Sequence, residues 1–317
     1  MNYYFDLLSE RQQDVYKEII NCFSRCKYEI EIPTLPHIEI EKIVEAVNMD
    51  NPWLFYVDFS RYKIRICDCL HQIVFNPLYS IKQVKELNAK INDSISKFET
   101  IRQLSELEKE ITIHNSLLKK IIYDSTNSSE IQLHSVIGPL LSKRTVCEGY
   151  AKAFKLLCDS FDITCIVVCG ELDIEGKKEL HAWNMVKLNG SWMHVDVTCD
   201  KIIPFSSPVI SSYYFNIGDQ RISANHYWDR ESYPKCVEQE MPFRKVIKSI
   251  NEIEFYLKKC CSQKSGTLRF AWDEQIGIDE SNYVEIASKY AKRCLNNKTV
   301  EVSFDPLIKS LMLSFSA

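Results

Sequence analysis

The chain has 317 residues, of which 45% are hydrophobic and 26% charged, so it can build the cores of roughly two or three globular domains. Its 39 Lys and Arg residues nearly balance 43 Asp and Glu residues, and a net charge of -4 gives no attraction for nucleic acid or an anionic membrane. We therefore expect a peptide or protein substrate, and neither nucleic acid nor a membrane as partner. Composition does not indicate the oligomeric state.

Residues 1–20 lack the basic stretch and apolar run of a leader peptide, and no later run is apolar enough to span a bilayer. The 13 cysteines are an odd number and fall in apolar runs such as 163–170, which favours buried free thiols in a reducing cytoplasm. Neither Cys67-x-Cys69 nor Cys260-Cys261 has the two-residue gap of a metal or redox pair. We expect a cytoplasmic protein without a metal or cofactor.

Hydrophobic periodicity predicts the elements in chain order. Residues 1–80 form a small α+β unit, with strands over 28–32, 53–59 and 72–75 around a helix over 38–47. Apolar residues spaced by three and four over 81–121 predict an amphipathic helix that is broken at least once.

The middle of the chain contains the strongest local signals. The pattern predicts a loop over 124–130, a short helix over 133–141, a packed helix over 148–161, a buried strand over 163–172, a loop over 173–179 and a strand over 181–188. Asn189-Gly190 predicts a tight hairpin turn, because both residue types tolerate positive φ.

The last segment has helices over 253–260 and 282–294 and strands over 267–272, 300–304 and 311–315. The order strand, helix, strand, strand also describes residues 28–79. We expect either two copies of one small unit or two unrelated appendages. The predicted domains are 1–80, 81–230 and 231–317.

Three residues carry the candidate chemistry. Cys147 stands at a helix start, and His181 and Asp196 lie on two strands that the 189–190 turn joins. If those strands pair around the turn, His181 opposes Thr198 and Trp183 opposes Asp196, so all four side chains share one face. His181 and Asp196 are then diagonal neighbours.

A thiol, an imidazole and a carboxylate in this order supply a nucleophile, its base and the group that orients the base. The first turn of the helix favours the Cys147 thiolate, and its N–H groups can hold an oxyanion. Asp196 would fix the tautomer of His181. Taken singly, each residue also fits a structural role: a buried thiol, a hydrogen-bonded core histidine and a salt-bridged carboxylate.

The motifs resemble the core of the transglutaminase-like superfamily of papain-type thiol enzymes. The matching stretches are TVCEGYAKAF (145–154), HAWN (181–184) and WMHVDVT (192–198), and the likeness to bacterial members extends over about 111–229. The resemblance implies an α+β papain-like core in which the helix with Cys147 packs on an antiparallel sheet. It also implies a catalytic triad of nucleophile Cys147, base His181 and orienting acid Asp196.

Two positions depart from that pattern. Glu148 stands where animal transglutaminases carry tryptophan, which weakens an inference to glutamine crosslinking. Cys199 stands where bacterial relatives carry a tryptophan. It is either a second thiol near the site or a tolerated substitution in the core.

Four neighbours have open roles. Trp183 either forms the bottom of the acyl site or covers Asp196. Tyr150 either lines the groove or packs its helix against the core. His194 shares the predicted hairpin face with Asp196, as a second base or as an exposed strand histidine. Glu148 either repels acidic substrates or favours the helix start.

These features predict thiol-dependent acyl chemistry on a peptide or protein amide through a Cys147 thioester, with no cofactor. Hydrolysis is the first choice, since water is always present and nothing marks a lysine-binding subsite. Amide transfer or cyclisation is the alternative within the same chemistry, and a non-catalytic interaction module that retains the fold is the alternative outside it. The sequence indicates neither the substrate nor the side-chain donor of the oxyanion hole.

Overall fold

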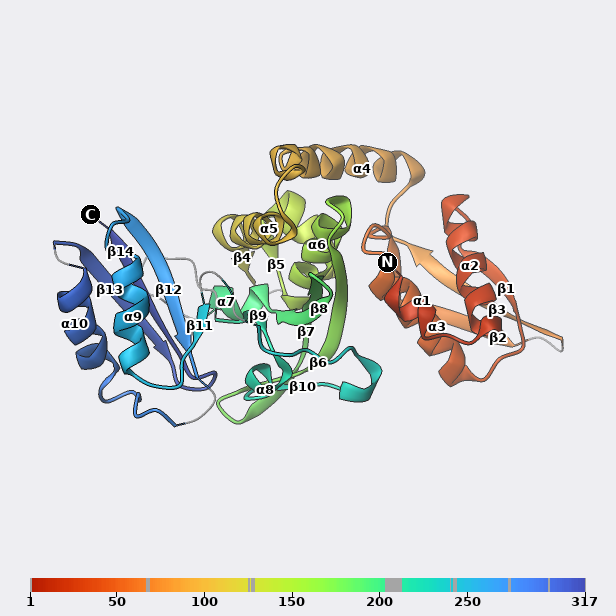
Figure 1. Cartoon of the computed structure of the whole chain (residues 1–317). Helices are drawn as coiled ribbons and strands as arrows, with labels where there is room; N and C mark the ends of the chain where they lie inside the picture. The colour runs from red at the N-terminus through yellow and green to blue at the C-terminus, as the bar shows by residue number, and fades with distance from the viewer. Residues whose placement is uncertain are drawn as a thin grey trace. The chain divides into compact units, whose positions relative to one another are not determined.

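The structure is a computed structural model that describes residues 2–66, 69–124, 126, 129–202, 213–239, 241, 244–272, 275–295 and 297–316. Its mixed helices and sheets confirm the α+β class (Figure 1). The chain forms two compact units, Met1–Cys169 with His181–Gly190, and Gly170–Leu180 with Ser191–Ala317. The division into three domains stays a prediction. Within the described residues, no helix combines the length and apolarity needed to cross a membrane.

The first unit begins with a three-stranded antiparallel sheet of order β1-β3-β2. Its elements are α1 (Tyr3–Asp6), α2 (Glu10–Ser24), β1 (Glu29–Pro33), α3 (His37–Asp50), β2 (Val57–Ile66) and β3 (Leu70–Pro77). The strands predicted over 28–32 and 72–75 and the helix predicted over 38–47 are present, whereas the strand predicted over 53–59 begins only at Val57 and runs to Ile66. Helix α2 was not predicted, although Val15, Ile19 and Phe23 are buried at helical spacing.

The amphipathic stretch from residue 81 is interrupted, as predicted. It forms α4 (Ile81–Ser96), the 3₁₀ turn η1 (Glu99–Ile101) and α5 (Glu106–Lys120). Ser80 and Ser105 each form a capping box, with Gln83 and Glu108 respectively. Each capping box satisfies N–H groups at the start of its helix. The box at Ser105 therefore favours the start of a second helix after the break.

The single helix predicted over 133–141 is wrong. A 3₁₀ turn, η2 (Ile131–His134), and a π-helical turn, η3 (Gly138–Ser142), replace it. Pro139 lies in the first turn of η3, where its missing N–H costs no intrahelical bond. The short strands β4 (Ile122–Tyr123) and β5 (Arg144–Thr145) pair in parallel on either side of this segment.

Helix α6 (Cys147–Ser160) is followed in the chain by the strands of a five-stranded sheet. The strands, in the order β10-β6-β7-β8-β9, are β10 (His226–Tyr227), β6 (Thr164–Ile174), β7 (Lys177–Leu188), β8 (Ser191–Val195) and β9 (Phe215–Ile217). The loop predicted over 173–179 is instead a tight turn at Glu175-Gly176, with φ of 54° and 85°. Asn184 Nδ2 donates to Ala151 O (3.0 Å) and Ile166 O (3.2 Å), which ties α6 to strands of the sheet.

The turn at Asn189-Gly190 is confirmed, with φ of 49° and 84°. The expectation that the second strand continues through Asp196 and Thr198 is wrong, because β8 ends at Val195 and α7 (Val197–Ile202) follows. Asp196 Oδ1 accepts a hydrogen bond from Cys199 N (2.9 Å). Asp196 is therefore the N-cap of α7, a position that Asp favours.

The last part of the chain builds a second small sheet of order β11-β12-β14-β13. It follows α8 (Asp219–Ile222) and η4 (Arg230–Ser232), and comprises β11 (Arg244–Val246), α9 (Asn251–Lys259), β12 (Ser265–Ala271), α10 (Tyr283–Cys294), β13 (Thr299–Asp305) and β14 (Ser310–Ser316). These bounds agree with the predicted helices and strands. Ile253 of α9 and Tyr290 of α10 pack in one apolar core with Leu268 and Leu313 of the sheet.

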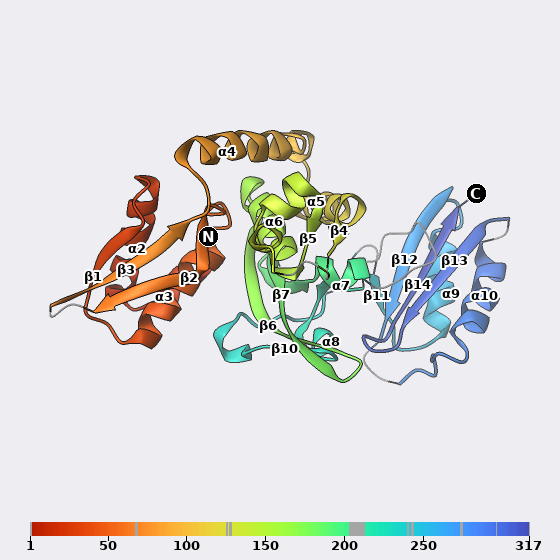
Figure 2. The same cartoon turned by 180° about the vertical axis from the view of Figure 1, so that it is seen from behind.

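The two small units share one topology. Helix, strand, helix, strand, strand describes both α2–β3 and α9–β14, and the third strand lies between the other two in β1-β3-β2 and in β12-β14-β13 (Figure 2). Strand β11 is an addition to the second unit. This shared topology is what two copies would show, and the duplication itself stays a prediction.

Candidate active site

Cys147 is the first residue of α6 and its side chain is half-buried. Val146, the N-cap residue, is extended, and its side chain makes no capping hydrogen bond. The first N–H groups of a helix have no partner within it, so they carry the positive end of the helix dipole. The thiol therefore stands where a thiolate, or an oxyanion formed beside it, is stabilised.

Close backbone packing fixes the start of α6. Thr145 Oγ1 donates to Leu133 O (2.8 Å), and Val146 N donates to the same oxygen (3.3 Å). A Cβ on Gly149 would lie 2.1 Å from Thr145 Oγ1 and 2.2 Å from Leu133 O. Only glycine fits at this position, directly after Cys147 and Glu148. Gly149 was not among the predicted site residues.

His181 and Trp183 lie on β7 and are both buried. Their rings stack with centroids 5.9 Å apart and an interplanar angle of 19°. Trp183 therefore supports the imidazole of the predicted base. Tyr150 is also buried, and its hydroxyl donates to Ile121 O (3.1 Å), as a side chain that packs its helix would do.

Asp196 belongs to a polar cluster that the sequence analysis missed. Its side chain is fully buried, and Asp196 Oδ2 lies 2.9 Å from His226 Nε2. Cys199 Sγ lies 3.9 Å from the same ring nitrogen. His226 comes from β10, thirty residues beyond Asp196, and no local pattern links the two. Cys199 is thus a second thiol beside the predicted acid.

The triad itself stays a prediction. Cys147 and His181 belong to the first compact unit, and Asp196 belongs to the second. Within each unit the structure gives the predicted residue a defined environment: a helix start for the thiol, a stacked ring for the base, and hydrogen bonds to both oxygens of the acid.

His194 is not an exposed strand histidine, and its carboxylate partner is not Asp196. The side chain is fully buried, and Nε2 lies 2.9 Å from Asp219 Oδ1. Burial lowers the pKa of His194 in spite of the opposing effect of Asp219. The regular strand behind the expected shared face with Asp196 is interrupted, because the pairing of β8 with β9 shifts register between His194 and Val195 and β8 ends there.

His194, Asp219 and Cys236 are residue types that bind metals, and their ligand atoms lie within 4.8 Å of one another. Asp219 Oδ1 faces His194, and Asp219 Oδ2 accepts from Cys236 N (3.1 Å). Burial and the neighbouring Asp219 raise the pKa of the Cys236 thiol. With both oxygens of its carboxylate engaged, Asp219 joins His194 to the backbone of Cys236 in a hydrogen-bonded clamp.

Glu148 is held by two partners. Its carboxylate lies 2.7 Å from Lys152 Nζ and 2.9 Å from His134 Nδ1. Burial works to raise the pKa of Glu148, but Lys152 and His134 outweigh it and hold this pKa at about 2. The charge of Glu148 is thereby compensated, so it does not present a free negative charge to a substrate.

No curated protein matches the chain in sequence. Residues 93–197 match the model of the Transglutaminase-like superfamily. Among solved structures, the chain is similar to one described as a TGase (13% identity, 59% of this chain and 56% of that chain, TM-score 0.34). It is also similar to the periplasmic domain of TgpA from Pseudomonas aeruginosa (13% identity, 41% of this chain and 53% of that chain, TM-score 0.28).

The chain spans little more than half the length of these two solved structures. The family match covers residues 93–197, whereas the predicted resemblance covered about 111–229. The match therefore begins earlier in the chain and ends earlier than predicted. It contains Cys147, His181 and Asp196. Residues 93–197 of this chain therefore belong to the transglutaminase-like superfamily.

Proposed function

We propose that the chain is an enzyme that cleaves a peptide or protein amide through a thioester on Cys147. The observation that carries this proposal is the half-buried thiol at the start of α6, within the segment that matches the superfamily. A helix start lowers the free energy of a thiolate, and the same N–H groups can bind the oxygen of a tetrahedral intermediate.

The reaction has two steps. The Cys147 thiolate attacks the amide carbonyl, the C–N bond breaks, and His181 passes its proton to the leaving amine. Water then attacks the thioester, gives a proton to His181, and releases the acid with the thiolate restored. Asp196 would orient His181, and His226 would hold Asp196 in place.

Hydrolysis and amide transfer differ only in which nucleophile takes the thioester. The test is incubation of the protein with a peptide library and a primary amine, followed by mass spectrometry, with Cys147→Ala as control. Cleaved peptides that require Cys147 support hydrolysis. Amine adducts without cleaved peptides would show that the reaction is amide transfer and not hydrolysis. If no product depends on Cys147, the result would support the alternative of a non-catalytic interaction module.

The cysteine thiols give an indication of the cellular compartment in which the protein works. All twelve described cysteines are free. We propose a reducing compartment such as the cytoplasm for this chain. Differential alkylation of the protein taken directly from its native cells should find reduced thiols, and a disulfide there would contradict this placement.

A further inference from the structure

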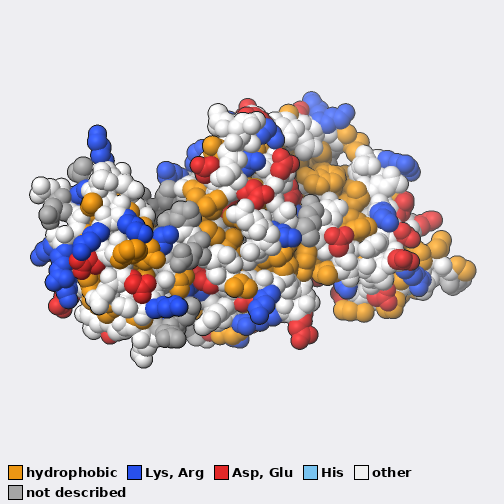
Figure 3. Space-filling model, viewed as in Figure 1, with side chains coloured by type: hydrophobic (Ala, Val, Ile, Leu, Met, Phe, Trp, Pro, Cys, Tyr) orange, Lys and Arg blue, Asp and Glu red, His pale blue; other side chains and the backbone are white. Residues whose placement is uncertain are grey.

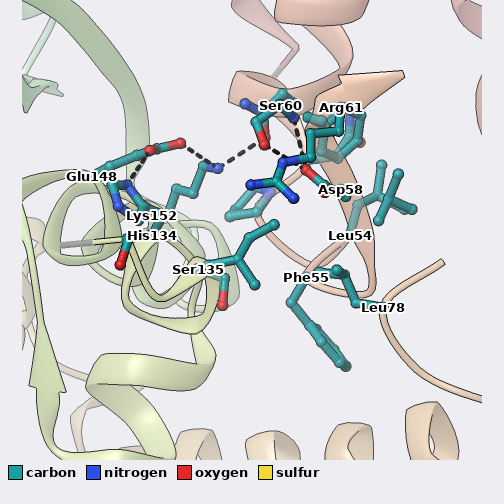
Figure 4. A pocket seen from close by; sticks show the side chains of 17 residues that line it. Leu54, Phe55, Asp58, Ser60, Arg61, Leu78, His134, Ser135, Glu148 and Lys152 are labelled. Carbon is teal, nitrogen blue, oxygen red and sulfur yellow. Dashed lines mark hydrogen bonds and ion pairs between the residues drawn. The ribbon is translucent and has the colours of Figure 1, made fainter. Parts of the chain in front are cut away.

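A cavity of about 590 Å³ lies within the first compact unit (Figure 4). One wall comes from the start of β2, with Asp58 and Arg61, and the other from η2 and α6, with His134, Glu148 and Lys152. Glu148 directly follows Cys147, and consecutive Cα atoms are about 3.8 Å apart. The cavity wall therefore begins one residue from the proposed nucleophile.

A β-bulge brings Arg61 to this cavity. The pairing of β2 with β3 shifts register between Asp58 and Lys63, and Arg61 lies in the irregular stretch. Asp58 Oδ1 holds that stretch by accepting from Ser60 N (3.0 Å) and Ser60 Oγ (2.6 Å). Bulges redirect side chains. Figure 4 shows the Arg61 guanidinium directed away from β2 toward the side of Glu148 and Lys152.

Most of the charged side chains on the α6 side of the cavity are paired with one another. Glu148 is paired with Lys152 and His134. Lys152 Nζ also donates to Asn48 Oδ1 (2.8 Å), so two of its three donors are used. The Arg61 side chain forms no hydrogen bond or ion pair with any part of the chain that the structure describes. A guanidinium with five donors thus faces an open cavity, opposite an ammonium with one donor left.

We propose that this cavity binds a carboxylate of the substrate, with Arg61 as its bidentate partner. A guanidinium fork matches the two oxygens of a carboxylate. Asp58 also lines the cavity, so the double negative charge of a phosphate would be repelled more strongly than a single one. The role of the cavity as a specificity subsite rests on the proposed function, whereas the binding of a carboxylate does not.

The test uses two probes of nearly equal shape, N-acetyl-glutamate amide and N-acetyl-glutamine amide. Calorimetry measures their affinities for the full-length wild type and for Cys147→Ala, Arg61→Ala, Arg61→Lys and Arg65→Ala. Arg65 is an exposed arginine of the same strand, paired with Glu29 and Gln72, and serves as the matched control. Inorganic phosphate is the third probe.

Wild type, Cys147→Ala and Arg65→Ala should bind the glutamate probe about tenfold more tightly than the glutamine probe. Arg61→Ala should abolish this preference, and Arg61→Lys should retain only part of it. Equal binding of the two probes by the wild type, no binding of either, or an unchanged preference in Arg61→Ala would overturn the inference. Phosphate bound through Arg61 as tightly as the glutamate probe would overturn the choice of a carboxylate.

The proposed function can fail separately. If Cys147 proves unreactive while the preference persists in Cys147→Ala, the cavity remains a carboxylate site and only its link to catalysis is lost. If Cys147 is reactive and the preference is absent, the enzyme proposal stands and the subsite proposal falls.

Discussion

The ring of His226 bridges two oxygen acceptors: Nε2 lies 2.9 Å from Asp196 Oδ2, and Nδ1 lies 2.7 Å from Asn225 Oδ1. A proton on Nε2 donates to the Asp196 carboxylate. Asp196 and His226 are almost fully buried, so this hydrogen bond takes the place of water at the carboxylate. The candidate acid is therefore held from the side of β10 as well as by its cap on α7.

Removal of this partner should be costly. His226→Ala leaves one oxygen of the buried Asp196 carboxylate without its hydrogen-bond partner, and we expect a loss of about 3 kcal/mol in the free energy of unfolding. Guanidinium chloride denaturation measures this loss. Tyr227→Ala, at the more exposed neighbouring position, is the control and should lose much less. A loss below about 1 kcal/mol in His226→Ala would contradict the hydrogen bond between His226 and Asp196.

Gly149→Ala tests the packing at the start of α6. The new methyl group would meet the Leu133 carbonyl at 2.2 Å, and a backbone carbonyl cannot move aside cheaply. We expect a loss of about 3 kcal/mol or more in unfolding free energy, at the upper end of overpacking effects, and slower alkylation of Cys147. Wild-type stability in this variant would show that the helix start is not packed as described.

Gly190→Ala tests a different cost of adding a methyl group. Nothing lies within 4 Å of the added Cβ, but φ is 84°, so the cost is backbone strain alone. Thermal or chemical denaturation should show a loss of about 1–2 kcal/mol. Gly190→Asn should lose less, because Asn adopts positive φ more readily. Equal losses for the two variants would argue against a left-handed turn.

The ionisation of Glu148 should contribute to stability in a defined pH range. Its folded pKa of about 2 lies below the ordinary value of 4.5, so the contribution is complete above pH 4.5 and is lost as the pH falls toward 2. Unfolding free energies between pH 5 and pH 2 should therefore fall less steeply in Glu148→Gln than in the wild type. Glu285→Gln removes an exposed carboxylate of α10 and should keep the wild-type slope.

Local patterns explain what the sequence could predict. Asn189-Gly190 marks its turn because few residues accept positive φ, and α6 shows its buried stripe through Ala151, Phe154 and Leu157. Asp196 was misplaced because the buried Val195 and Val197 continue the alternation of a strand. An Asp before a helix start was the competing signal, and capping decided the outcome.

Non-local relationships could not be predicted in this way. His226 reaches Asp196 through the pairing of β10 with β6, at Leu172, which no spacing in the sequence reveals. Arg61 reaches its cavity through a bulge, and a bulge adds residues to one strand of a pair whose pairing is unknown beforehand. The pairing of Glu148 with His134 likewise depends on the fold of η2.

The central claim is that Cys147 is an activated thiol that depends on His181. Peptide-resolved mass spectrometry after brief treatment with iodoacetamide measures the alkylation rate of each cysteine in the folded protein. Cys147 should react much faster than the exposed Cys26 and Cys261, and its rate should drop in His181→Ala while theirs stay unchanged. A Cys147 rate equal to that of the exposed thiols, or one that His181→Ala leaves unchanged, would contradict the account.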